Sequence, residues 1–182
     1  MNSKVTKCFV TLSEMFHDRG YEKEAELLSN LDIKEKIIFN IDIDDYIKII
    51  FNLSKKIKMA EIKKLIMEES FKKYIIVTLD KLSQANIKSV NELNLDVQFF
   101  HVSELLFNIT KHSLVPKHVL INDDKQIKSI MEKFSVKSKA QLPILLKNDP
   151  VAKYHDAKPG NLMMITRSSP SAGEHVIYRY VV

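Results

Sequence analysis

The segment KIIFNIDIDDYIKIIFNL, residues 36–53, carries the clearest structural signal in the sequence. Apolar residues occupy every second position on both sides of the acidic pair Asp44-Asp45, and this period of two is typical of half-buried strands. The alternating residues are Ile37, Phe39, Ile41, Ile43, Ile47, Ile49, Phe51 and Leu53. The segment therefore predicts two antiparallel strands joined by a turn at Asp44-Asp45.

The sequence around this strand pair alternates between helical and extended patterns. Apolar residues at helical spacing predict a helix from Val5 to Phe16, with Gly20 where a C-cap would lie, and a second helix over residues 59–66. The run YIIVTL, residues 74–79, is typical of a buried strand, Ser83 can cap a further helix, and residues 97–102 form the last predicted strand. The first part of the chain is thus predicted to be an α/β domain, with a small mixed sheet flanked by helices.

The composition changes after Lys111. All five prolines and two of the three glycines lie beyond this residue, which predicts two domains, residues 1–111 and 112–182. In the second domain a helix is predicted after Asp123-Asp124, and two strands are predicted at residues 162–166 and 176–181. These strands are joined by the polar loop RSSPSAGEH, so we expect a small α+β domain that ends in a β-hairpin.

The charge distribution separates the same two parts. Of 28 basic and 23 acidic residues, 17 of each lie in residues 1–111, which leaves 11 basic and 6 acidic residues and the whole net charge of +5 in residues 112–182. Such a surplus suits either nucleic acid or an acidic protein partner. Only Arg19, Arg167 and Arg179 are arginines, and this disfavours autonomous reading of DNA sequence, which relies on the forked guanidinium group. No apolar run approaches the roughly 20 residues that span a bilayer, so no membrane partner is expected.

The sequence offers little support for catalysis. Three scattered glycines cannot form a phosphate-binding loop, and His112 and His118 lack the further ligands of a zinc site. Cys8 lies on the apolar face of a predicted helix and has no positioned base. Glu61 and Lys63 have the spacing of a metal-dependent nuclease, but on a helix their side chains would diverge. We therefore expect no catalytic residue, no metal and no cofactor.

Three blocks in the second domain carry a resemblance to a known family. They are NITKHSLVPKHVLI at residues 108–121, QLPILLKNDPVAKY at 141–154 and PGNLMMITRSSPSAGEHVIYRYV at 159–181. The first block matches at His112, Leu114, Val115, Pro116 and His118. The second matches at Gln141, Leu142, Pro143 and the run Asp149–Tyr154, and the third at Gly160, Arg167, Ser169, Ala172, Gly173, Tyr178 and Arg179. In these blocks the sequence resembles the fifth-subunit family of RNA polymerases, which has archaeal and eukaryotic members.

The resemblance implies a non-catalytic subunit of a DNA-dependent RNA polymerase whose C-terminal domain docks on the largest subunit. The residues that it implies for partner binding are Pro116, His118, Asp149, Pro150, Lys153, Tyr154, Arg167, Gly173, Tyr178 and Arg179. Prolines fix extended segments or the first turn of a helix, and glycines allow turns that other residues disfavour. The two arginines can form forked bonds with carboxylates of a partner.

A weaker resemblance in the first domain lies at His17–Tyr21, which is similar to the end of the first helix in eukaryotic members. In that family this domain is called the jaw, lies near downstream duplex DNA and is absent from archaeal members. The resemblance implies that Lys81, Ser83, Gln84, Ala85 and Lys88 lie close to DNA, although Gln84 replaces the family's usual proline. A helix N-terminus favours phosphate, which agrees with this placement.

The resemblance also bears on where the protein works. A cellular member is expected in the nucleus, and a member from a large DNA virus in a cytoplasmic viral factory or a virion. The alternative to a polymerase subunit is a free-standing transcription regulator that binds nucleic acid through the basic C-terminal domain.

Overall fold

The computed structural model describes residues 2–29, 38–43, 46–53, 59–68, 71–93, 95–169 and 173–182. The chain divides into two compact units: unit 1 comprises Met1–His17 and Tyr21–Phe107, and unit 2 comprises Asp18–Gly20 and Asn108–Val182. The division of the chain by function at Lys111 stays a prediction. The expected turn at Asp44-Asp45 and the matched residue Ala172 lie outside the described residues.

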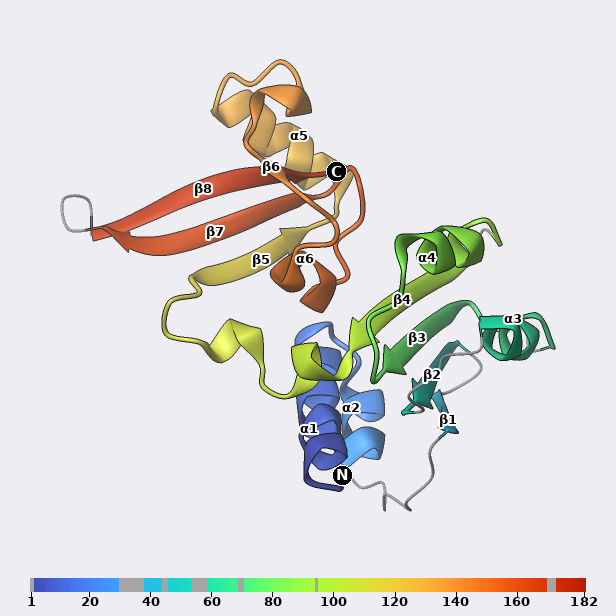
Figure 1. The fold of residues 1–182 in the computed structure, drawn as a ribbon. Helices are drawn as coiled ribbons and strands as arrows, with labels where there is room; N and C mark the ends of the chain where they lie inside the picture. Colours follow the sequence, from blue (N-terminus) through green and yellow to red (C-terminus); the bar gives the residue numbers. More distant parts are fainter. Residues whose placement is uncertain are drawn as a thin grey trace. The chain divides into compact units, whose positions relative to one another are not determined.

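Unit 1 contains a mixed four-stranded sheet in the order β1-β2-β3-β4 (Figure 1). The strands are β1 (Ile38–Ile43), β2 (Ile47–Asn52), β3 (Lys73–Thr78) and β4 (Asp96–His101). β1 and β2 are antiparallel, as the alternating segment predicts, whereas β2, β3 and β4 run parallel. Parallel neighbours need a crossover connection. α3 (Met59–Glu68) and α4 (Gln84–Asn91) supply these connections, and the 3-10 helix η1 (Val102–Leu105) follows β4.

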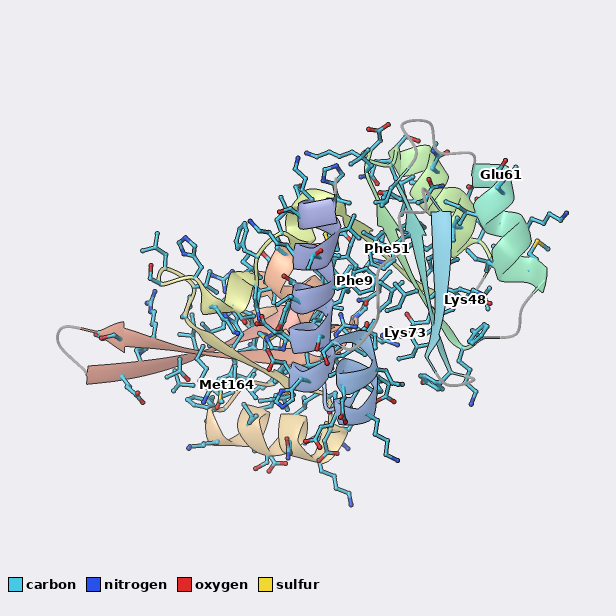
Figure 2. The ribbon with its side chains drawn as sticks, turned by 90° about the horizontal axis from the view of Figure 1, so that it is seen from below. Phe9, Lys48, Phe51, Glu61, Lys73 and Met164 are labelled. Carbon is cyan, nitrogen blue, oxygen red and sulfur yellow. The ribbon has the colours of Figure 1, made fainter. Side chains whose placement is uncertain are left out.

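Helices contact both faces of this sheet. Ile50, Tyr74 and Ile76 on one face form a core with Ile62 of α3 and Val90 of α4. On the other face the Phe51 ring stacks on Phe9 of α1 (Asn2–Asp18), with ring centroids 4.8 Å apart (Figure 2). The α/β layer predicted for the first part of the chain is therefore present.

The helix α2 (Glu22–Ser29) was not predicted from the sequence. This helix has only two turns, and its sequence EKEAELLS contains three apolar residues, too few to show a helical period. The Ser13 hydroxyl of α1 donates a 2.7 Å hydrogen bond to the carbonyl of Ala25 in α2. Contact with α1 thus stabilises a helix that its own sequence signals only weakly.

Unit 2 contains a second four-stranded sheet, in the order β5-β7-β8-β6 (Figure 1). Its strands are β5 (Lys117–Ile121), β6 (Ile144–Leu145), β7 (Leu162–Ser169) and β8 (Gly173–Val181). β7 is antiparallel to β5 and β8, and β6 is parallel to β8. The helices are α5 (Asp124–Lys133) and α6 (Pro150–Tyr154), with 3-10 helices η2 (Ile109–Lys111) and η3 (Lys139–Gln141).

The two faces of this second sheet have separate cores. Met163 and Ile165 of β7 pack with Ala152 of α6, whereas Leu162 of β7 packs with Ile127 of α5. Odd-numbered residues of β7 and β8 therefore share the face covered by α6, and even-numbered residues share the face covered by α5. Extended chain was predicted beside Pro116 and Pro143, but not that these segments join the sheet as β5 and β6.

Candidate partner-binding surface

The start of α6 is fixed by two of the residues predicted for partner binding. Asp149 is the N-cap, and its Oδ1 accepts hydrogen bonds from the amides of Val151 at 2.9 Å and Ala152 at 3.4 Å. Pro150 occupies the first turn and is exposed. The predicted N-cap and helix start are therefore confirmed. The cap occupies Asp149 Oδ1, and the exposed ring of Pro150 can contact a partner here.

The end of α6 is held by Arg19, a residue of unit 2 although it follows α1. Its Nε donates to the carbonyl of Tyr154 at 2.9 Å, and Nη2 donates to the carbonyl of Lys153 at 2.8 Å. The last carbonyls of a helix have no partners within the helix, and a cation at that end also interacts favourably with the helix dipole. Arg19 thus stabilises a helix of only five residues.

Tyr154 is 3% exposed and hydrogen-bonded within unit 2. Its hydroxyl donates to Asp18 Oδ2 at 2.7 Å and accepts from Asn108 Nδ2 at 2.8 Å. Burial raises the pKa of Tyr154, and the adjacent Asp18 carboxylate raises it further. The side chain predicted for partner binding therefore holds the unit together. Sequence reasoning missed Asp18, Arg19 and Asn108, although the motif His17–Tyr21 marked the first two.

His118 lies on β5 at the face covered by α6. It is half-buried, and its Nδ1 lies 2.6 Å from the carbonyl oxygen of Pro116. Burial lowers the pKa of the neighbouring His155, and the positive charges of His118 and Arg19 lower it further, whereas Asp18 opposes this shift. The imidazole ring of His118 thus contacts the backbone of Pro116, and both residues are half-buried.

The predicted residues of β7 and β8 lie on different faces of the sheet. Arg167 is exposed on the odd-numbered face, where Arg179 also lies, whereas Tyr178 is on the even-numbered face with its ring centroid 5.4 Å from that of Phe134. Gly173 is exposed and has a φ of +70°, which glycine adopts readily. The structure therefore does not bring the ten predicted residues into one patch.

Arg179 is incompletely bonded. Its Nη1 lies 3.5 Å from the carbonyl oxygen of Ile144, at the long limit for a hydrogen bond. Its Nε is buried and has no hydrogen-bond partner among the described residues. A buried donor of this kind is costly to leave unpaired, so the Arg179 side chain is held at a cost in stability.

Of the five residues predicted to lie near DNA, four lie at the start of α4 in unit 1 and Lys88 lies in its last turn. Ser83 caps the helix by accepting a 3.3 Å hydrogen bond from the amide of Asn86, as the sequence predicts. The five predicted residues, Lys81, Ser83, Gln84, Ala85 and Lys88, are all exposed. Lys81 lies beside the helix N-terminus, which favours phosphate, whereas Lys88 lies in the last turn of α4.

The features considered for catalysis do not converge. Glu61 lies on α3, as predicted (Figure 2), and no group of three or more His, Cys, Asp and Glu side chains that could hold a metal occurs among the described residues. Cys8 is buried, and its thiol lies 3.7 Å from the carbonyl oxygen of Val102. In the described part of the chain no helix is both long enough and apolar enough to cross a membrane.

Comparison with known proteins places the chain in a family. Residues 107–181 match the family described as RNA polymerase Rpb5, C-terminal domain. A protein of Arabidopsis thaliana named as subunit 5B of DNA-directed RNA polymerases IV and V is 31% identical, over 94% of this chain and 86% of its own length. A Dictyostelium discoideum protein named as subunit rpabc1 of polymerases I, II and III is 29% identical over 94% of both chains. The Rpo5 subunit of Pyrococcus horikoshii is 43% identical over 42% of this chain. The chain therefore belongs to the family of RNA polymerase subunit 5, or Rpb5.

Proposed function

We propose that this protein is a non-catalytic subunit of a multisubunit DNA-dependent RNA polymerase. The observation that carries the proposal is the similarity over 94% of the chain to a protein named as a polymerase subunit. Residues 1–111 act as the jaw and residues 112–182 as the assembly domain, which ends in the hairpin of β7 and β8. In a cell the protein works in the nucleus, and in a large DNA virus it works in the viral factory or the virion.

The assembly domain docks on the largest subunit of the polymerase. The exposed members of the predicted set, Pro150, Arg167 and Gly173, supply contacts, and Pro116, His118, Lys153, Tyr178 and Arg179 contribute through their accessible atoms. Asp149 and Tyr154 act indirectly, because they fix α6 and so the shape of the surface. The surplus of positive charge in residues 112–182 suits a partner surface that carries carboxylates.

This docking is tested by affinity purification of the tagged full chain from its source cells. We expect the largest polymerase subunit to elute with it, and we expect Pro150→Ala with Arg167→Ala to lower the retained amount. Both side chains are exposed, so the fold should tolerate these changes. Lys125→Ala, at an exposed position of α5, is the matched control. Undiminished retention by the double variant would contradict the assigned contacts.

The jaw lies near downstream duplex DNA, with the start of α4 facing the phosphates. The support is the exposed Lys81 beside the N-terminus of α4, together with the exposed Lys88 further along the same helix. Photoreactive nucleotides downstream of the transcription bubble should crosslink to this chain in the intact polymerase. We expect Lys81→Glu with Lys88→Glu to weaken the crosslink, whereas Lys4→Glu with Lys23→Glu, at exposed positions of α1 and α2, should not. Equal crosslinking by both double variants would contradict the placement.

The charge distribution supports one second candidate, a free-standing regulator that binds nucleic acid. That candidate predicts a chain that elutes without polymerase subunits and binds duplex DNA with a strong dependence on salt.

A further inference from the structure

The outer edge of β6 in unit 2 carries unpaired backbone groups. The amides of Tyr180 and Val182 donate to the carbonyls of Pro143 and Leu145 at 2.8 and 3.0 Å, and the amide of Lys147 donates to the carbonyl of Val182 at 2.8 Å. Residues 143, 145 and 147 therefore direct their bonding groups toward β8. Ile144 and Leu146 alternate with them, so their amides are directed away from β8, while the Leu146 carbonyl accepts from the amide of Asp149 at 2.9 Å.

The side chains of the same two residues are apolar and exposed. Ile144 is 56% exposed and Leu146 is 64% exposed, although both lie in an extended segment of a folded unit. Proteins usually protect a sheet edge with charge, with a covering element or with proline. Here Pro143 protects one position, and the next positions present an apolar surface together with free donors. Such an edge can receive a further strand.

Arg179 provides the charge at this edge. Its side chain leaves β8 on the face covered by α6 and reaches the carbonyl oxygen of Ile144, at a distance of 3.5 Å from Nη1. The buried Nε has no partner among the described residues. The acid closest to β6 in the sequence, Asp149, already accepts two amide hydrogen bonds at the start of α6. The Nη donors of the half-exposed guanidinium group are therefore available for an external carboxylate.

From these three features we propose that the outer edge of Pro143–Leu146 binds an extended, acidic segment of another polymerase subunit. The segment forms backbone hydrogen bonds with Ile144 and Leu146, covers their side chains with apolar residues, and places a carboxylate on Arg179. The inference rests on the proposed function, because it specifies how the assembly domain is held in the polymerase.

A protein segment fits this edge better than nucleic acid does. The outward-directed amides of Ile144 and Leu146 match the spacing of carbonyls along a strand, and their side chains favour an apolar neighbour. Phosphates would need several cations, whereas the segment Pro143–Lys147 contributes one, the exposed Lys147, and Arg179 of β8 adds a second.

The occupant can be identified by crosslinking in the assembled polymerase. p-Benzoylphenylalanine is placed at Leu146 in the full chain, the polymerase is purified and irradiated, and the attached peptide is identified by mass spectrometry. We expect a peptide of a polymerase subunit that contains Asp or Glu near apolar residues. Attachment to DNA, to a basic segment or to no polymerase subunit would overturn the inference.

Variants test the energetics separately. Leu146→Asp places a carboxylate on the apolar edge, and Arg179→Lys keeps the charge but loses the fork, so each should lower retention of the polymerase by about tenfold. Met67→Asp is the matched control, because Met67 is 72% exposed and lies in unit 1. If the unsubstituted chain retains no polymerase, the proposed function fails. If it does retain polymerase and both variants do so equally well, only the β6 edge is wrong.

Discussion

Tyr154→Phe should destabilise unit 2 by roughly 2–3 kcal/mol, because the substitution removes one buried and one part-buried hydrogen bond and little else. The hydroxyl lies 2.7 Å from Asp18 Oδ2 and 2.8 Å from Asn108 Nδ2. A hydrogen bond to a charged group, such as the one to Asp18, contributes about 1.5–3 kcal/mol, and a neutral one, such as the one from Asn108, about 1 kcal/mol. Part of the neutral contribution is offset because neighbouring polar groups rearrange in the variant. The phenyl ring stays in place, so no large cavity forms.

The measurement is equilibrium unfolding of the full chain in urea, followed by circular dichroism because the sequence contains no tryptophan. Hydrogen exchange of the α6 amides reports the stability of unit 2 separately from that of unit 1, since two units need not unfold together. Tyr178→Phe is the control: Tyr178 makes a ring contact with Phe134, which the change preserves, so we expect a loss within about 0.5 kcal/mol. Equal stabilities of the two variants would refute the role assigned to the Tyr154 hydroxyl.

Three further predictions concern single residues. Gly160→Ala should destabilise the protein by about 1–3 kcal/mol through backbone strain alone, because Gly160 has a φ of +100° and an added Cβ would meet no atom within 4 Å; an unchanged urea midpoint would contradict this. The pKa of His155 is lowered from 6.5, so the folded state disfavours its proton, and stability present above pH 6.5 should fall as the pH falls through the folded pKa. His155→Gln should flatten this loss between pH 7 and 5 in urea titrations, and parallel curves would exclude the effect. Burial raises the pKa of the Cys8 thiol to about 11, so Ellman's reagent at pH 8 should detect the thiol only after unfolding; rapid labelling of the folded chain would show that the site opens.

Local sequence patterns predicted most of the fold because each reflects a local physical cause. The alternating segment at residues 36–53 predicted β1 and β2, and the capping residues Ser83, Asp123 and Asp149 predicted where three helices begin. A cap forms hydrogen bonds within three residues of itself, so the neighbouring sequence is sufficient to identify it. The helix α2 was not predicted, because its own apolar residues are few and its stability depends on packing against α1.

The candidate site was less predictable because its geometry depends on contacts between distant residues. Arg19 and Tyr154 are separated by 135 positions, and no local pattern indicates that a guanidinium group at one end of the chain caps α6 near the other. Arg179 could be named from its residue type, but its unpaired Nε follows from where β8 places it beside β6. The two-residue strand β6 has too short a pattern to show a period.

The most direct test of the central claim is purification of the untagged native protein from its source under mild conditions, with every bound protein identified and quantified. The account predicts that the two large subunits of an RNA polymerase remain bound in equimolar amounts and that the fraction transcribes DNA. A protein that behaves as a free monomer, in an extract where that polymerase remains intact, would contradict it.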